Sequence, residues 1–494
     1  MKYHSTRSRS EAMSCKDALI QGLASDGGLY VTDALDELSL NIGDCMTLSY
    51  EEIAEKVFSL YLPDFSSKEL RDCIGKAYAK KFDDDRLTPV TTIGGDRLLE
   101  LFHGPTSAFK DMALCMLPQL MSAALKERQE RIMILTATSG DTGKAALEGF
   151  KNAENIGISV FYPHGGVSDI QYLQMATQEG RNTAAAAVTG NFDDCQSAVK
   201  EVFEKHSAEI LERTGVRLSS ANSINIGRLI PQVVYYIDAY RQLLNERAIT
   251  MGDPVDFIVP TGNFGDVLAG FFAKKAGLPI GKLLVASNEN KVLTDFLESG
   301  VYDRRRPFIK TISPSMDILI SSNLERLLYY ACGGDTEYIC SLMKSLRETG
   351  SYRIDDAMLK TIRENFCCGY ADNETSGRAI KEAWEKDGRL IDPHTAVAYS
   401  VLKDRRAELE GKAQIILSTA SPYKFPKEVY EAVFGGADRF DSGFACMDAL
   451  EEKTGIPAPA ALKELRSKPV LHRAVIPADG IKDFTFQEIE RQFK

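Results

Sequence analysis

The chain has 494 residues, of which 44% are apolar and 26% are charged, and its formal net charge is −11. At about 100–200 residues per domain this length allows roughly two to four domains, and the apolar fraction excludes a disordered chain. The acidic balance argues against nucleic acid or an anionic membrane as the main partner, because both require a basic surface.

The first hundred residues are expected to be mostly helical, with helices over residues 51–62 and 67–80 and a strand over residues 97–102. Residues 1–19 are basic and rich in hydroxyl groups but lack the apolar segment of a secretion signal. No apolar run approaches the roughly 18 residues that span a bilayer. We therefore expect a cytoplasmic protein with no membrane partner.

Short apolar runs alternate with helix-length amphipathic segments through most of the remaining chain. The runs predicted as strands are residues 132–137, 158–162, 184–188, 257–260, 283–286 and 415–418. The segments predicted as helices are residues 112–125, 144–151, 167–178, 195–210 and 267–276. This alternation is typical of right-handed βαβ units in a parallel sheet, whose chemistry gathers where the strands end.

These patterns predict an α/β protein with two parallel-sheet lobes. We expect residues 1–95 to form a helical N-terminal unit, residues 96–260 one lobe and residues 261–494 a second, larger lobe. A helix-rich stretch from about residue 313 to 388 is predicted to be an insertion in the second lobe. The ten cysteines and six histidines show no ligand spacing, so we expect free thiols and no metal.

Lys110 follows a Gly-Pro turn and an aromatic residue, at the predicted start of a helix. The positive end of the helix dipole disfavours a cation there, so this position favours a neutral amine. A neutral lysine amine can attack an aldehyde and form a Schiff base. An ordinary surface lysine is the alternative for this residue taken alone.

Two glycine-rich loops follow predicted strands and open predicted helices. Residues 138–143 read Thr-Ser-Gly-Asp-Thr-Gly, and residues 260–266 read Pro-Thr-Gly-Asn-Phe-Gly-Asp. Backbone amides at such junctions bind a carboxylate or a phosphate, although a tight capped turn is the alternative for the first loop. The first loop is not a nucleotide P-loop, because Thr138 and Ala145 stand where that motif needs a glycine and a hydroxyl residue. Two anion sites and a neutral lysine suit pyridoxal phosphate, held between the lobes.

Motifs along almost the whole chain resemble those of the threonine synthases, a family of fold type II pyridoxal-phosphate enzymes related to tryptophan synthase β. The motifs lie at residues 3–7, 22–30, 102–111, 139–143, 161–165, 191–196, 222–228, 260–266, 313–317, 392–396 and 419–425. Their order resembles the longer, yeast- and enterobacterial-type branch. The resemblance implies conversion of O-phospho-L-homoserine and water to L-threonine and phosphate.

The resemblance also implies a role for individual residues. Lys110 resembles the Schiff-base lysine, Asp141 lies near the cofactor's phenolic oxygen, and Thr419 resembles the hydroxyl partner of the pyridine nitrogen. The cofactor phosphate cup is Gly262, Asn263, Phe264, Gly265 and Asp266, and the loop for the substrate carboxylate includes Ser139, Gly140 and Thr142.

The leaving phosphate needs a cation of its own, and the candidates are Arg228 and Lys144. An ion pair on a helix face is the alternative for Arg228. We expect His103, His394 and residues 313–317 to serve the architecture.

Two other functions stay open. One is a different type II reaction, such as serine or threonine dehydration or β-replacement, although those enzymes typically carry asparagine where Asp141 stands. The other is a threonine-synthase-like protein that binds the cofactor with altered activity. In each case we expect a small-molecule partner, no nucleic acid, and a monomer or homodimer.

Overall fold

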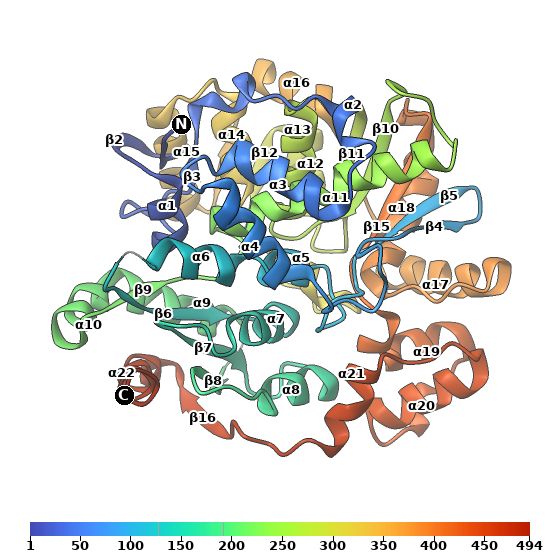
Figure 1. Ribbon diagram of the computed structural model, residues 1–494. Coiled ribbons are helices and arrows are strands. Elements are labelled where there is room, and N and C mark those ends of the chain that lie inside the picture. Colours follow the sequence, from blue (N-terminus) through green and yellow to red (C-terminus); the bar gives the residue numbers. More distant parts are fainter. Residues whose placement is uncertain (127, 191) are drawn as a thin grey trace.

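The larger of two parallel sheets has six strands in the order β14-β11-β10-β15-β5-β4, and Figure 1 shows β15, β5 and β4 lying together. A computed structural model describes residues 1–126, 128–190 and 192–494. The strands are β4 (Val90–Ile93), β5 (Asp96–Glu100), β10 (Val255–Pro260), β11 (Ile280–Ser287), β14 (Phe366–Tyr370) and β15 (Ala413–Ser418). All neighbours are parallel except β4 and β5. Every residue of β10 is buried, as expected for a central strand of a sheet covered on both faces.

The smaller sheet has five parallel strands in the order β16-β8-β7-β6-β9. They are β6 (Arg131–Ala137), β7 (Ile156–Pro163), β8 (Thr183–Thr189), β9 (Val216–Ser219) and β16 (Ala474–Pro477). The three central strands match predicted apolar runs. The two edge strands are only four residues long and gave no such signal in the sequence.

The strands of the two sheets do not follow the residue ranges predicted for the two lobes. Strands β5 and β10 fall within the range 96–260 but pair in the larger sheet, and β16 returns the end of the chain to the smaller sheet. Parallel strands need long crossover connections, and these allow strands that are distant in sequence to pair in one sheet. Contiguous ranges therefore do not mark sheet membership. The α/β class with two parallel-sheet lobes agrees with the sequence prediction.

The N-terminal unit contains the expected helices and also a small antiparallel sheet. Its helices are α1 (Cys15–Gln21), α2 (Ile42–Cys45), α3 (Tyr50–Tyr61) and α4 (Ser67–Tyr78), and its strands are β1 (Tyr3–Ser5), β2 (Ser8–Met13) and β3 (Tyr30–Val31). Reciprocal capping boxes start α3 at Ser49 and α4 at Ser66. The three strands have two to six residues and lack a clear alternation, which explains why the sequence predicted a mostly helical unit.

Most of the remaining helices pack on sheet strands or on one another. They are α5 (Lys110–Leu114), α6 (Leu117–Leu125), α7 (Asp141–Phe150), α8 (Asp169–Ala176), α9 (Phe192–Glu201), α10 (Ser207–Thr214), α13 (Val292–Ser299), α14 (Leu324–Ala331), α15 (Thr336–Thr349), α16 (Asp356–Asn365), α17 (Asn373–Asp387), α18 (Pro393–Arg405), α19 (Pro426–Phe434), α20 (Gly443–Thr454), α21 (Ala460–Lys463) and α22 (Ile481–Gln492). No helix within the described ranges has the length and apolar character of a membrane span.

Two predicted helices are interrupted in the structure. The segment 112–125 divides into α5 and α6, because Pro118 fits only the first turn of a helix. The segment 195–210 contains a five-residue π-helix, Val202–His206, between α9 and α10. The predicted insertion at 313–388 is mostly helical, but it also supplies the edge strand β14. Its strand β13 (Ser351–Arg353) pairs with β12 (Val301–Asp303), which precedes the predicted insertion.

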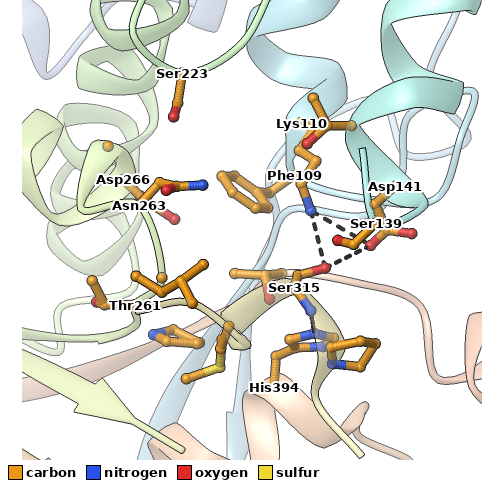
Figure 2. Close-up of a pocket in the computed structure, with 18 of the residues that line it drawn as sticks. Phe109, Lys110, Ser139, Asp141, Ser223, Thr261, Asn263, Asp266, Ser315 and His394 are labelled. Carbon is orange, nitrogen blue, oxygen red and sulfur yellow. Dashed lines mark hydrogen bonds and ion pairs between the residues drawn. The ribbon is translucent and has the colours of Figure 1, made fainter. Parts of the chain in front are cut away.

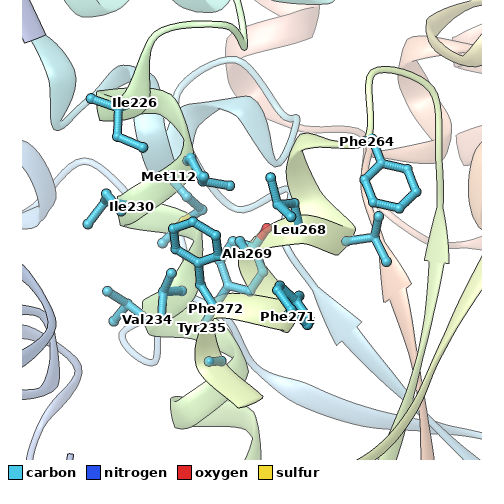
Figure 3. Close-up of a cluster of buried hydrophobic side chains, with 14 of the residues drawn as sticks. Met112, Ile226, Ile230, Val234, Tyr235, Phe264, Leu268, Ala269, Phe271 and Phe272 are labelled. Carbon is cyan, nitrogen blue, oxygen red and sulfur yellow. The ribbon is translucent and has the colours of Figure 1, made fainter. Parts of the chain in front are cut away.

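Helix α11 (Ile226–Asn245) packs on α12 (Gly265–Lys275) within a cluster of buried apolar side chains. Figure 3 shows side chains from the two helices interleaved, with Ile230 and Val234 on α11 and Leu268 and Phe272 on α12. Each of these side chains is at most 1% exposed. Burying an aliphatic or aromatic side chain contributes about 1.5–3 kcal/mol. This packing fixes the N-terminal ends of both helices, which carry the candidate residues Arg228 and Asp266.

His103 forms a charged clamp outside the candidate site. Its ring nitrogens lie 2.6 Å from Asp83 Oδ1 and 2.9 Å from Glu100 Oε2. Burial alone would lower the pKa of His103, but the two carboxylates outweigh burial and raise that pKa to about 9. The resulting stabilisation is complete below the unfolded pKa of about 6.5 and is lost as the pH rises through 9.

We therefore expect His103→Gln to lower the free energy of unfolding by about 2 kcal/mol near neutral pH and much less near pH 10. Urea denaturation of the variant and the parent at both pH values measures this difference. A destabilisation that does not change with pH would contradict a charged His103.

Candidate functional site

A pocket lies between the two lobes, where strands of both sheets end. Ala137 ends β6, Pro260 ends β10, and Thr419 follows β15, and all three line the pocket. The N-terminal ends of α7 and α12 also reach it. This is the edge at which parallel sheets bind ligands, as the sequence predicted.

Lys110 is placed in the pocket by pairing between two segments that are distant in sequence. The Phe109 amide donates to the Thr419 carbonyl over 2.8 Å, and Ala108 bridges to Ala420. Asp111 accepts hydrogen bonds from the Thr106 amide and hydroxyl and so fixes the preceding turn. Lys110 is therefore the first residue of α5, with a side chain that points into the pocket.

The Lys110 amine lies between Asp141 and Ser315 (Figure 2). Its Nζ is 3.5 Å from Asp141 Oδ2 and 3.4 Å from Ser315 Oγ, and Lys110 is only 8% exposed. Burial lowers the pKa of this amine; Asp141 opposes that shift, and the positive charges of Lys424 and Arg228 add to it. Burial thus shifts the Lys110 amine toward the neutral form, which is the direction that its position in the sequence predicted.

The loop after β6 carries Ser139, Asp141 and Thr142 into the pocket. The Thr138 hydroxyl accepts the amides of Gly140 and Gly143 over 3.0 and 2.9 Å, which fixes the turn. Burial would raise the pKa of Asp141, but Lys424 and Lys110 hold it well below its usual range. Asp141 is therefore a carboxylate at neutral pH.

Gly140 shapes this loop without lining the pocket. Its φ is +138°, and a Cβ there would lie 2.4 Å from Cδ of Gln171. Gln171 donates to Asp141 Oδ1 over 3.0 Å, so the glycine leaves room for the side chain that orients Asp141.

We expect Gly140→Ala to destabilise the protein by about 1–3 kcal/mol and to lower activity, because the added methyl group would displace Gln171. Urea unfolding and a turnover assay measure the two effects. Gly75→Ala in α4 is the matched control, since a Cβ there meets no atom within 4 Å and alanine favours a helix. Equal behaviour of the two variants would contradict this role of Gly140.

The second glycine-rich loop forms a cup at the start of α12. Gly262, Asn263, Phe264, Gly265 and Asp266 all line the pocket. A Cβ on Gly262 would lie 2.9 Å from the Ser315 carbonyl oxygen, so only glycine allows segment 315–316 to approach the loop. Phe264 has φ +61°, a left-handed conformation that turns the chain into the helix. The amides at this N-terminus are suited to an anion.

Asp266 is a buried carboxyl group inside this cup. The hydroxyl groups of Tyr235 and Tyr236 donate to its Oδ1, whereas its Oδ2 has no partner among the described residues. Burial raises the pKa of Asp266 to about 6, although the two tyrosines lower it in part. An easily protonated carboxyl group is compatible with a phosphate on the neighbouring amides.

Arg228 is buried and lines the pocket, and it has no carboxylate partner among the residues that the structure describes, unlike the ion pair considered from the sequence. One of its NH groups donates to the Ala221 carbonyl over 2.7 Å, whereas its Nε has no partner within the described ranges. Burial lowers the pKa of Arg228 to about 10. A buried cation with an unused donor is a site for an anionic ligand.

Lys144 does not belong to the pocket lining. Its amine lies 2.9 Å from Glu148 Oε2 and also bonds Gln178 Oε1. The prediction that Lys144 binds the substrate phosphate is therefore not supported by its position. The reason is that Lys144 lies almost one turn further along α7 than Asp141, where Glu148 and Gln178 bind its amine.

Sequence reasoning missed several residues of the site. Ser315, assigned to the architecture, contacts Lys110 and Asp141, and His394 Nε2 accepts the Ser315 amide over 3.1 Å. Lys424 pairs with Asp141 from behind. The recognised motifs at 313–317, 392–396 and 419–425 contain all three residues and were the available signal. Asn191, in the motif 191–196, lies outside the described residues.

The donors present fit pyridoxal phosphate. The amides of the cup and the unused Arg228 Nε suit phosphate groups, and the Lys110 amine suits an aldehyde. Thr419 lines the same pocket and carries a hydroxyl group. No cluster of three or more His, Cys, Asp or Glu side chains suited to a metal ion occurs in residues 1–126, 128–190 and 192–494.

Comparison with protein families matches three parts of the chain, of which the second and third overlap. Residues 2–78 match the threonine synthase N terminus, residues 98–419 match the pyridoxal-phosphate-dependent enzymes, and residues 395–469 match the threonine synthase C-terminal family. The second match alone covers more than half of the chain.

Individual proteins agree with these matches. A threonine synthase from Pseudomonas aeruginosa is 38% identical over 92% of this chain and 95% of its own. The crystal structure of a threonine synthase with bound pyridoxal phosphate from Brucella melitensis is 36% identical, has a TM-score of 0.85 and covers 99% of both chains. Human threonine synthase-like 1 is 39% identical over 84% of this chain, which spans 58% of that protein.

Proposed function

The chain belongs to the threonine synthase family of pyridoxal-phosphate-dependent enzymes, and we propose that it converts O-phospho-L-homoserine and water to L-threonine and inorganic phosphate. The observation that carries this proposal is the buried Lys110 amine, with a lowered pKa, in one pocket with the cup and Arg228. The threonine synthases with similar sequences and folds support the same reaction.

Four groups of residues would hold the cofactor. Lys110 would bind its aldehyde carbon, the cup 262–266 its phosphate, Asp141 the side near its phenolic oxygen, and Thr419 the ring nitrogen. When bound, pyridoxal phosphate supplies an electron-accepting ring that stabilises negative charge at the substrate carbon atoms. A hydroxyl group at Thr419, in place of a carboxylate, would leave the ring nitrogen largely unprotonated and would moderate this effect.

Lys110 would also move protons. Once the substrate amine has taken its place, the free Lys110 amine can remove the α-proton and return a proton at a neighbouring carbon. Asp141 and Ser315, at 3.5 and 3.4 Å, can accept its hydrogen bonds and aim it. A single amine on one face of the substrate is then base and acid in successive steps.

The substrate would be oriented from both of its ends. Ser139, Thr142 and the amides at the start of α7 suit the substrate carboxylate, with Gly140 shaping that loop. Arg228 suits the leaving phosphate. Water then adds at the carbon next to the one that bears the amine.

Assays with competing substrates test this function. We expect phosphate release and threonine formation from O-phospho-L-homoserine, and little ammonia or pyruvate from serine or threonine. The reverse pattern would favour a dehydratase. Cofactor binding without phosphate release would favour a threonine-synthase-like protein, and failure to restore growth of a threonine-requiring strain would support that outcome. A cytoplasmic location and a monomeric or homodimeric state stay predictions.

A further inference from the structure

A second buried lysine, Lys424, lies behind Asp141. Lys424 is 0% exposed, and its amine is 2.9 Å from Asp141 Oδ1 and 2.9 Å from the Thr106 carbonyl oxygen. It ends the short 3-10 helix Pro422–Lys424, which follows β15 of the larger sheet. Asp141 begins α7 beside the smaller sheet. The ion pair therefore joins the two lobes directly behind the pocket.

The two oxygens of Asp141 have different partners. Oδ1 receives Lys424 and the amide of Gln171, over 2.9 and 3.0 Å. Oδ2 faces Lys110 and Ser315, as the dashed lines in Figure 2 show. Lys424 thus binds Asp141 Oδ1, the oxygen that does not face the Lys110 amine.

The charges around Lys110 explain why such a partner matters. A buried carboxylate at 3.5 Å favours a protonated amine, which cannot attack an aldehyde. The groups that act on Lys110 are Asp141 on α7, Lys424 after β15, Arg228 on α11 and Asp266 on α12. Asp111, next to Lys110, faces Lys424 as well. Lys424 offsets the negative charge of Asp141. The Asp141 carboxylate can therefore orient the Lys110 amine without keeping that amine protonated.

We propose that Lys424 is a positioning residue that balances the charge of Asp141 and thereby lets the Lys110 amine lose its proton and bind the cofactor aldehyde. In that step the amine nitrogen forms a C=N bond to the aldehyde carbon and the aldehyde oxygen leaves as water. The inference rests on the proposed cofactor-binding role of Lys110. It goes beyond that role because Lys424 does not line the pocket.

The rate of cofactor attachment in four proteins tests this inference. Cofactor-free parent, Lys424→Met, Asp141→Asn and the double variant are mixed with pyridoxal phosphate from about pH 6 to pH 10. The adduct is trapped by cyanoborohydride reduction, and mass spectrometry of the peptide that contains residue 110 gives the initial rate. The readout is the pH at which that rate is half-maximal, and it does not depend on turnover.

We expect Lys424→Met to raise this midpoint by about 1–2 pH units, because it leaves an unbalanced carboxylate beside Lys110. Asp141→Asn should lower the midpoint, because it leaves an unbalanced cation. The double variant removes both charges and should return the midpoint to within about half a unit of the parent. If Lys424 served only to pack the turn at Thr106, the midpoints of the four proteins would not rank in this way.

Two results would overturn the inference. One is a midpoint in Lys424→Met equal to that of the parent. The other is a midpoint in the double variant equal to that of Lys424→Met. If Lys424→Met does not fold by circular dichroism, the comparison of Asp141→Asn with the double variant decides instead, since the double variant must then have the higher midpoint. Failure of the parent to attach the cofactor at residue 110 would instead refute the proposed function.

Discussion

Lys110→Ala is expected to abolish covalent binding of pyridoxal phosphate and to lower phosphate release by more than about 10³-fold. The variant removes both the amine that binds the aldehyde and the group that moves the α-proton, and general acid–base catalysis alone contributes about 10²–10⁴-fold. Borohydride reduction followed by mass spectrometry measures the first effect, and a phosphate assay measures the second.

Lys274→Ala is the matched control for Lys110→Ala. Burial also lowers the pKa of Lys274, but this residue lies at the far end of α12, and its amine donates to the Gly281 carbonyl over 2.8 Å. We expect the control to bind the cofactor and to release phosphate at a rate within about threefold of the parent. If the cofactor still bound covalently to Lys110→Ala, the reactive amine would have to belong to another lysine.

The features that were predictable from sequence depend on local patterns. The central strands β6 and β10 are continuous apolar runs, and each is followed by a glycine-rich loop that opens a helix, so their ends pointed to the pocket. Lys110 was found because its own neighbours place it at a helix start. Such signals do not require knowledge of how distant segments meet.

The features that were missed depend on distant contacts. Ser315 and Lys424 surround Asp141 from positions 174 and 283 residues further along the chain, and nothing in their own neighbours indicates that contact. Lys144 is the opposite case. It is close to the loop in sequence, but Glu148 and Gln178 bind its amine almost one turn further along α7, outside the pocket lining. The contact with Gln178 joins segments 34 residues apart, so proximity to the loop in sequence does not reveal it.

Arg228→Met is expected to raise the KM for O-phospho-L-homoserine by about 10²-fold or more, since charge-assisted hydrogen bonds to a buried guanidinium contribute several kcal/mol to anion binding. Methionine retains much of the side-chain length but lacks the charge and the unused Nε donor. Initial rates over a range of substrate concentrations give the KM. Absorbance titration with pyridoxal phosphate gives the affinity for the cofactor in the same protein.

The pattern of these two measurements identifies the anion that Arg228 binds. A raised KM with unchanged cofactor affinity assigns the guanidinium to the substrate phosphate, whereas a loss of cofactor affinity assigns it to the cup beside Asp266. Arg228→Lys retains the charge but not the forked pair of donors, so its KM should lie between those of the parent and Arg228→Met. An unchanged KM in both variants would leave the buried Arg228 a structural cation, stabilised by the Ala221 carbonyl and the α11 packing alone.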